Sequence, residues 1–198
     1  MDFFVATKNL KKLAEIERIL APLGIKALCE RDFDLDFPEV EEDGETFRDN
    51  ALIKAEAGMK ITGLPTIADD SGLCVDALGG EPGVYSARYA GEPCDNHKNN
   101  LKLLDALKEV PDQERTARFV SSIACVFPDG RKVFADGKVE GKIAFDMRGT
   151  RGFGYDVLFI SELGYFAEIT DEEKDSISHR GRALRLLKEK LTEILGEK

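Results

Sequence analysis

Two adjacent carboxylates, Asp69 and Asp70, come directly after the apolar run Thr66–Ala68, and Ser71 and a glycine-rich loop follow them. Because successive residues of a strand point to opposite faces, one carboxylate can enter a crevice while the other makes structural bonds. Open α/β sheets bind ligands beyond the carboxyl ends of their strands, and we expect the strand to be interrupted at this pair. The pair is a candidate metal-binding and catalytic site; the alternative is an Asx turn that ends the strand.

A second acidic stretch, EVEEDGE, carries Glu39, Glu41, Glu42 and Asp43. Such a run is usually a solvated loop, and it gains meaning only if it meets the two aspartates in space. Mg²⁺ prefers carboxylate oxygens and is typically held by one or two carboxylates together with substrate phosphates. One carboxylate from this loop and one from the aspartate pair would satisfy that preference.

The sequence ATKNLKK lies where a predicted strand passes into a predicted helix. Backbone amides at a helix N-terminus point outward unpaired, and the helix dipole there favours an anion. Thr7 and Asn9 can cap the helix, Lys8 and Lys12 supply positive charge, and Lys54 lies on a later predicted helix. The segment is a candidate phosphate-binding site without P-loop glycines; the alternative is an ordinary helix cap with solvated lysines.

The sequence RGFGYDVLF places Phe153 between Gly152 and Gly154, with Tyr155 and Asp156 directly after them. An aromatic ring held between glycines can lie flat against a nucleobase, and the carboxylate and backbone groups can then read the base edge. The alternative is a tight turn that enters a strand whose phenylalanine packs in the core.

Further along, EEKDSISHRGRALRLL supplies Lys174, His179 and Arg180 near the start of the last predicted helix. Arginine is a bidentate donor that keeps its charge, so this cluster can donate to a base carbonyl or to a phosphate. A single histidine more often makes a structural bond than does chemistry. We expect the other histidine, His97, to lie on the surface.

Helical and strand-like patterns alternate along the chain, which predicts one α/β unit with a partly antiparallel sheet. Capping boxes predict helices that begin near Thr46 and Thr170. The final helix should bury one apolar face, made of Leu184, Leu187, Leu191, Ile194 and Leu195. Strands are expected in FFVAT, on both sides of the aspartates in 66–78, in a hairpin over 116–144 with a Pro-Asp-Gly turn, and in 155–160.

The composition narrows the class of protein. The 198 residues carry a formal net charge of −10, which argues against a surface for the nucleic-acid backbone. The four cysteines form no C-x-x-C pair. The start MDFFVATKNLKKL lacks the features of a signal peptide and no apolar run approaches the length of a membrane span, so we expect neither. We therefore expect a soluble cytoplasmic protein with free thiols.

Taken in order, these motifs resemble the house-cleaning inosine triphosphate pyrophosphatases, also called non-canonical purine nucleoside triphosphate pyrophosphatases. The resemblance runs nearly end to end. Its parts are T-x-N-x-x-K at Thr7, Asn9 and Lys12, then EEDGETFRDNALIKA, ADDSGLCVDALGGEPGVYSARYAG, GFGYDVLF and EEKDSISHRGRAL.

The resemblance implies a single domain over residues 1–198 with a two-lobed mixed sheet, flanking helices and an active-site cleft between the lobes. It implies a cytoplasmic homodimer that binds neither nucleic acid nor membrane. The implied reaction is Mg²⁺-dependent hydrolysis of ITP, dITP and XTP to the nucleoside monophosphate and pyrophosphate, which removes deaminated purines from the nucleotide pool.

Site residues follow from the same resemblance. Glu41 and Asp70 would bind the magnesium, and Asp70 would also activate the water. Glu41 fits the family spacing because it lies three residues before Gly44, and Glu42 is the alternative ligand. The resemblance further implies a set of substrate-binding residues: Thr7, Lys8, Asn9, Lys12 and Lys54 for the triphosphate, Ser71 for a further contact, and Phe153, Gly154, Tyr155, Asp156, Lys174, His179 and Arg180 for the base. Arg88 and the glycine-rich loop would shape either the cleft wall or the dimer contact.

Overall fold

The computed structural model describes residues 1–196, so residues 197 and 198 of the predicted 1–198 domain lie outside the described residues. The chain divides into two compact units. The first contains Met1–Asp70, Ser121–Gly137 and the chain from Arg180 onward, and the second contains Ser71–Val120 and Lys138–His179. The chain therefore passes from one unit to the other within three strands, at 70–71, 120–121 and 137–138, and within the last helix, at 179–180, rather than through linkers.

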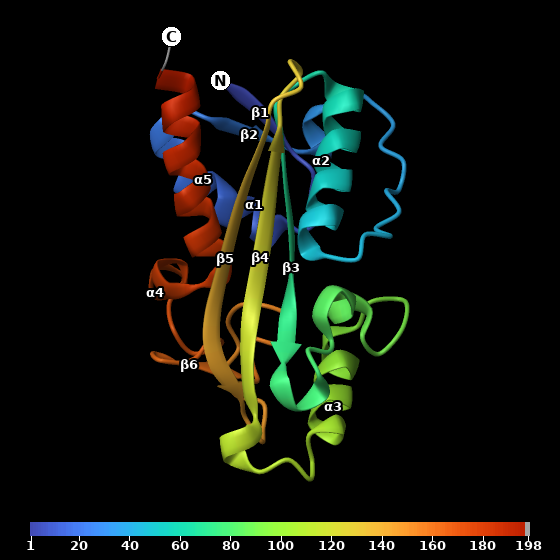
Figure 1. Cartoon of the computed structure of the whole chain (residues 1–198), viewed down its shortest axis with the longest axis vertical. Helices are drawn as coiled ribbons and strands as arrows, with labels where there is room; N and C mark the ends of the chain where they lie inside the picture. Colours follow the sequence, from blue (N-terminus) through green and yellow to red (C-terminus); the bar gives the residue numbers. More distant parts are fainter. Residues whose placement is uncertain (197–198) are drawn as a thin grey trace. The chain divides into compact units, whose positions relative to one another are not determined.

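The strands follow the hydrogen-bonded order β2-β1-β3-β4-β5-β6-β7. Strand β1 pairs in parallel with β2 and β3, whereas β5, β6 and β7 pair antiparallel, which confirms the predicted mixed sheet. Figure 1 shows β3, β4 and β5 as the long strands. The bounds are β1 Asp2–Val5, β2 Lys26–Leu28, β3 Thr66–Val75, β4 Thr116–Val126, β5 Lys132–Ile143, β6 Phe159–Ser161 and β7 Gly164–Tyr165.

The α-helices begin where the sequence offers caps. The Asn9 side chain accepts hydrogen bonds from two backbone amides at the start of α1. The predicted capping boxes at Thr46 and Thr170 are confirmed at the starts of α2 and α4. The bounds are α1 Leu10–Leu20, α2 Phe47–Thr62, α3 Asn96–Ala106, α4 Asp171–Ile177 and α5 His179–Gly196.

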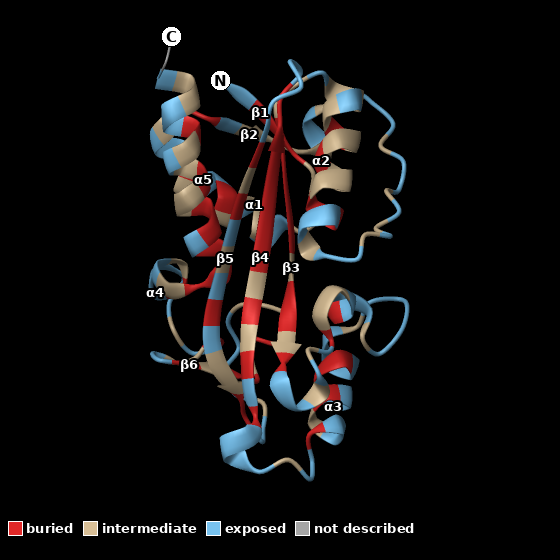
Figure 2. Cartoon of the chain, viewed as in Figure 1, coloured by how far each residue is buried: buried red, intermediate tan, exposed pale blue. Residues whose placement is uncertain are grey.

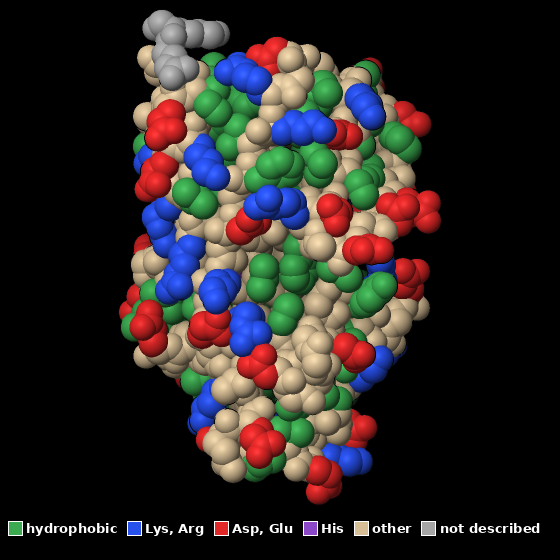
Figure 3. All heavy atoms as spheres, in the orientation of Figure 1, with side chains coloured by type: hydrophobic (Ala, Val, Ile, Leu, Met, Phe, Trp, Pro, Cys, Tyr) green, Lys and Arg blue, Asp and Glu red, His purple; other side chains and the backbone are tan. Residues whose placement is uncertain are grey.

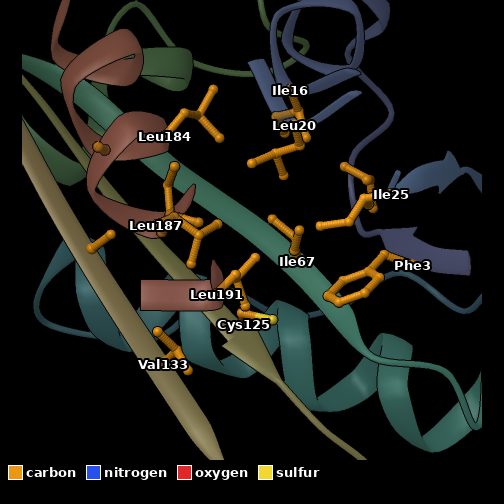
Figure 4. Packing of buried hydrophobic residues seen from close by; sticks show 14 of the residues in the cluster. Phe3, Ile16, Leu20, Ile25, Ile67, Cys125, Val133, Leu184, Leu187 and Leu191 are labelled. Atoms are coloured by element: carbon orange, nitrogen blue, oxygen red, sulfur yellow. The ribbon is translucent and has the colours of Figure 1, made fainter. Parts of the chain in front are cut away.

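The core of the first unit lies on both faces of its strands. Helices α1 and α5 bury the expected leucines of α5 against Ile67 of β3, as Figure 4 shows. On the opposite face, α2 packs Ala51 and Ala55 against Ala68 of β3. Successive residues of β3 thus face different layers, as the two-residue period of a strand requires. The adjacent aspartates that follow are directed to opposite faces by the same alternation.

The second unit has its own core. Leu103 of α3 and Leu107, which directly follows this helix, pack with Phe119 of β4 and with Phe159 and Phe166 near β6 and β7. The rings of Phe119 and Phe159 lie 4.7 Å apart between centroids, a close aromatic contact. In Figure 2 the buried residues of β4 form a nearly continuous stretch at its end in the first unit and alternate with less buried ones in the second.

Two predicted strands differ from the structure. Strand β3 runs without interruption from Thr66 to Val75, so Asp69 and Asp70 lie inside the strand and do not end it. The predicted strand 155–160 is also wrong in its first part: β6 begins at Phe159. Residues 155–158 form turns because the Asp156 carboxylate accepts the backbone N–H of Phe153 and closes the chain on itself.

The surface carries charges of both signs. On the face drawn in Figure 3, Lys and Arg side chains lie among Asp and Glu side chains. Exposed pairs such as Lys142 and Asp112 connect opposite charges directly. No helix within residues 1–196 combines the length and apolar character that a membrane span needs.

Candidate active site

The two adjacent aspartates of β3 have different partners. Asp69 is fully buried and forms ion pairs with Lys12 at 2.7 Å and with Arg180 at 3.2 Å. Asp70 forms an ion pair with Lys54 at 3.0 Å, and 13% of its side chain is exposed. Asp69 therefore ties three segments of the first unit together, while Asp70 keeps an accessible carboxylate.

The charge of Asp69 is fixed by its surroundings. Burial alone would raise its pKa, but the positive charges of Arg180 and Lys12 hold the pKa well below its usual range. The Ser121 hydroxyl donates a further hydrogen bond to the same carboxylate. Asp69 therefore stays ionised and has a structural role in these ion pairs, and it is unsuited to exchange a proton near neutral pH.

The pKa of Asp70 is shifted in the opposite direction from that of Asp69. Burial raises its pKa, and the nearby Glu42 carboxylate raises it further, against the lowering effect of Lys54 and Lys12. A carboxylate whose proton affinity is raised is better suited to accept a proton from water than an ordinary aspartate. This environment suits the acceptance of a proton, and the catalytic role of Asp70 stays a prediction.

Lys54 connects Asp70 with the acidic loop. Its ammonium lies 2.8 Å from Glu42 and 3.0 Å from Asp70. Burial lowers the pKa of Lys54, but the two carboxylates outweigh burial and raise it. The loop carboxylate that lies near Asp70 is that of Glu42, whereas Glu41 is exposed.

The carboxylate pair suits a hard cation that is also coordinated by a substrate. Within residues 1–196, no group of three or more His, Cys, Asp or Glu side chains is arranged to hold a metal ion. Glu42 and Asp70 both contact the Lys54 ammonium, so the two carboxylates lie around one point of positive charge. This donor set fits Mg²⁺, which commonly takes one or two carboxylates and completes its shell with phosphates and water.

The predicted phosphate-binding segment lies at the N-terminus of α1. Thr7 accepts the backbone N–H of Asn9, and Asn9 in turn caps α1. Lys8 is exposed, and burial lowers the pKa of Lys12, although Asp69 opposes that effect. The structure therefore brings the N-terminus of α1, Lys12 and Lys54 together within the first unit, and a helix N-terminus beside two ammonium groups suits an anion.

Arg180 lies in the first unit and is almost fully buried. Its guanidinium contacts Glu15 at 2.6 Å as well as Asp69. Burial would lower its pKa, but these two carboxylates raise it. The structure therefore gives Arg180 a bracing function that the sequence analysis did not predict.

The other residues that were predicted to bind the base lie in the second unit. The Asp156 carboxylate accepts the N–H of Phe153 at 2.8 Å and the ammonium of Lys174 at 2.6 Å. The same ammonium lies 5.1 Å from the centre of the Phe153 ring. A Cβ on Gly152 would collide with the Asp156 carboxylate, so only glycine fits there. Asp156 thus holds the Phe153 turn and Lys174 in one rigid group.

The other residues that were predicted to bind substrate here pack or form hydrogen bonds within the second unit. The His179 ring stacks on Phe119 with centroids 4.8 Å apart. Tyr155 is buried, and its hydroxyl donates to the Ser86 carbonyl, while the Gly154 carbonyl accepts from Asn100. Ser71 directly follows Asp70 in β3 and is half-buried. His97 is exposed, as expected.

Sequence reasoning missed three residues that touch the site. Asn50 donates to Asp70, Glu15 binds Arg180, and Ser121 donates to Asp69. Helical spacing could have indicated two of them, because Asn50 lies four residues before Lys54 and Glu15 lies three residues after Lys12. Ser121 carries no such signal, since its partner lies 52 residues away.

Comparison with known proteins gives consistent matches over nearly the whole chain. A family model described as the Ham1 family matches residues 3–190. The chain is 55% identical over 189 residues to a dITP/XTP pyrophosphatase of Geobacter sulfurreducens, covering 94% of each. It is 51% identical over 187 residues to a dITP/XTP pyrophosphatase of Desulforamulus reducens, covering 93% of this chain and 92% of the other.

Two solved structures are also similar. A HAM1 protein from Coxiella burnetii has 41% sequence identity and a TM-score of 0.88, with 98% of this chain and 99% of that chain covered. The Staphylococcus aureus Ham1 protein has 39% identity and a TM-score of 0.85, and both chains are covered completely.

Proposed function

Because the chain belongs to the Ham1 family, we propose that it hydrolyses dITP, ITP and XTP to the nucleoside monophosphate and pyrophosphate. Removal of these deaminated purines would keep them out of nucleic-acid synthesis. The observation that carries the proposal is the environment of Asp70, a partly buried carboxylate with raised pKa that lies beside Lys54 and Glu42.

Hydrolysis of a nucleoside triphosphate depends mainly on the position of the reacting groups and on stabilisation of the phosphate charge. Cleavage between the α and β phosphates needs an aligned water, neutralised charge and a hold on the leaving pyrophosphate. Asp70 takes the proton from the attacking water, and its raised pKa favours that transfer. No covalent nucleophile is needed for phosphoryl chemistry of this kind.

Charge neutralisation falls to basic side chains and backbone amides of the first unit. The N-terminal amides of α1 and the residues Thr7, Lys8, Asn9 and Lys12 would hold the triphosphate, assisted by Lys54.

Asp70 and one glutamate of the acidic loop would hold a magnesium ion. When bound, the ion offsets phosphate charge and polarises the phosphoryl oxygens. Spacing favours Glu41 for the loop position, and contact with Lys54 favours Glu42.

Base selection would follow from donors in the second unit, with Ser71 contacting the substrate. Hypoxanthine and xanthine carry O6 where adenine carries an amino group. The Lys174 ammonium has three N–H groups and directs one of them to Asp156, so others can donate to O6. His179 would contribute a further donor, and the segment Phe153, Gly154, Tyr155 and Asp156 would hold the base. Arg180, which the resemblance also assigns to the base, lies in the first unit, where its three guanidinium nitrogens already donate to Asp69 and Glu15. A donor that faces an amino group is left unpaired, which discriminates strongly against adenine.

The assembly and location follow the same family. We expect a homodimer, which light scattering after size-exclusion chromatography would measure. A reducing cytoplasm suits Cys29, Cys74, Cys94 and Cys125, all free thiols in the structure.

A panel of ITP, dITP, XTP, GTP, ATP, CTP and TTP with Mg²⁺ tests the proposal, provided that pyrophosphate and orthophosphate are recorded separately. Pyrophosphate from ITP, dITP and XTP, with little from the standard nucleotides, is the expected result. Orthophosphate alone would place the cleaved bond elsewhere and overturn the proposed position of the water. Tight ITP binding without turnover would instead indicate a nucleotide sensor.

A further inference from the structure

Asn50 joins two parts of the candidate active site through a single side chain. It lies in the first turn of α2 and is 2% exposed. Its Oδ1 accepts the backbone N–H of Gly44 at 2.8 Å, and its Nδ2 donates to Asp70 Oδ2 at 3.4 Å. One amide therefore connects the acidic loop to the catalytic carboxylate.

The same connection is made a second time, one helical turn later. Lys54 lies four residues after Asn50, so both side chains leave the same face of α2. Lys54 contacts Glu42 in the acidic loop and Asp70 Oδ1, whereas Asn50 contacts Gly44 in that loop and Asp70 Oδ2. The two oxygens of Asp70 are thus assigned to two different donors, and the orientation of the carboxylate is fixed.

Gly44 is shaped for this contact. A Cβ at that position would lie 2.7 Å from Asn50 Oδ1 and 2.7 Å from the Asp49 Cβ. The backbone of the acidic loop can approach α2 so closely only because residue 44 has no side chain. The loop is therefore built to meet the Asn50 amide.

We propose that Asn50 is a positioning residue: it holds the acidic loop and the Asp70 carboxylate in the relative position that cation binding and water activation need. The proposal rests on the proposed function. An amide suits the position because it offers an acceptor to Gly44 and a donor to Asp70 at once. It also carries no charge, so it orients Asp70 while the neutralisation of Asp70 is left to Lys54 and a bound cation.

The test compares Asn50→Leu, which keeps the approximate shape and removes both hydrogen bonds, with the matched control Asn99→Leu. Asn99 is also a buried helix asparagine, and its amide joins three backbone groups: it accepts the N–H of Ala90 and donates to the carbonyls of Ala87 and Ser86. We expect Asn50→Leu to lower kcat/KM for ITP by roughly 10- to 100-fold, the usual cost of losing a side chain that orients a ligating group. The control should lower the thermal midpoint and leave the kinetics of the folded enzyme unchanged.

A second readout needs no turnover. The thermal midpoint of each variant is titrated with Mg²⁺ alone, and Asn50→Leu should need roughly 10- to 100-fold more Mg²⁺ for the same rise. Equal Mg²⁺ dependence and equal kcat/KM in wild type and Asn50→Leu would overturn the proposal.

If Asn50→Leu does not fold, Asn50→Asp replaces it. The aspartate keeps the acceptor for Gly44 and loses the donor to Asp70, so kcat should fall at least about tenfold. A kcat equal to that of wild type would overturn the proposal. Wild-type protein that releases no pyrophosphate from any nucleotide would defeat the proposed function instead, and the Mg²⁺ titration would still decide the role of Asn50.

Discussion

Arg180 binds Asp69 through two nitrogens: its Nε and Nη2 each lie 3.2 Å from the same carboxylate oxygen, and both side chains are buried. Glu15 holds the third nitrogen of the guanidinium. One of two adjacent aspartates is therefore neutralised permanently by a buried arginine, which leaves its neighbour, Asp70, as the group with chemical freedom.

Arg180→Ala should destabilise the protein strongly, because it leaves Asp69 and Glu15 buried with less positive charge nearby. Removal of one member of a buried ion pair typically costs about 3–5 kcal/mol in the free energy of unfolding. Urea denaturation measures the loss. Arg182→Ala is the control, since this exposed arginine of the same helix should change stability by less than about 0.5 kcal/mol. Equal losses in the two variants would contradict the bracing role of Arg180.

Asp70→Asn and Asp69→Asn should separate catalysis from stability at neighbouring positions. Asp70→Asn removes the base, so kcat for ITP should fall by about 10²–10⁴-fold. Its thermal midpoint should not fall, because burial already disfavours the charged form and raises the pKa of Asp70.

Asp69→Asn should instead lower the midpoint, since Arg180 and Lys12 lose their counter-charge. Steady-state kinetics and thermal unfolding of both variants give the comparison. Near-wild-type turnover in Asp70→Asn would remove Asp70 from the mechanism.

The glutamates at positions 41 and 42 can be distinguished by their effect on the Mg²⁺ requirement. Glu42 shares Lys54 with Asp70, whereas Glu41 is exposed. We therefore expect Glu42→Gln to raise the Mg²⁺ concentration for half-maximal activity at least about tenfold, and Glu41→Gln to change it far less. The activity of each variant is titrated with Mg²⁺ at saturating ITP. A larger effect of Glu41→Gln would support the ligand that the family spacing predicts.

Local sequence signals predicted much of the fold correctly. The capping boxes at Thr46 and Thr170 need only residues three positions apart, and a short turn is enough to specify the β4–β5 hairpin. The mixed sheet followed from the alternation of helical and strand-like segments. Each of these features depends on neighbours in the sequence, which is why it could be inferred without a structure.

The uninterrupted strand β3 depends on a distant partner. Two adjacent carboxylates normally disfavour a buried strand, yet Asp69 is accommodated because Arg180, 111 residues later, supplies its counter-charge. Asn50 was missed for a similar reason: its spacing from Lys54 indicates a shared helix face, but nothing in the sequence places it beside Gly44 and Asp70. Both features arise from contacts that only the folded chain creates.

The thiols should differ sharply in reactivity. Burial raises the pKa of Cys125 to about 12, whereas Cys94 is exposed. Because the thiolate is the nucleophile, only about one Cys125 in ten thousand is reactive at pH 8. Iodoacetamide should therefore modify Cys94 first and spare Cys125 until urea unfolds the chain, as peptide mass spectrometry would show. Equal labelling of both cysteines in the folded protein would contradict the burial of Cys125.

Lys174 should act on both stability and substrate binding, and a double variant can separate the two. Lys174→Met leaves the buried Asp156 carboxylate without its cation, so stability should fall by about 3–5 kcal/mol and KM for ITP should rise. Lys174→Met combined with Asp156→Asn removes both charges, and it should recover much of the stability without recovering KM. Urea denaturation and initial rates with ITP measure the two effects. Recovery of KM in the double variant would show that Lys174 only neutralises Asp156 and does not contact the substrate.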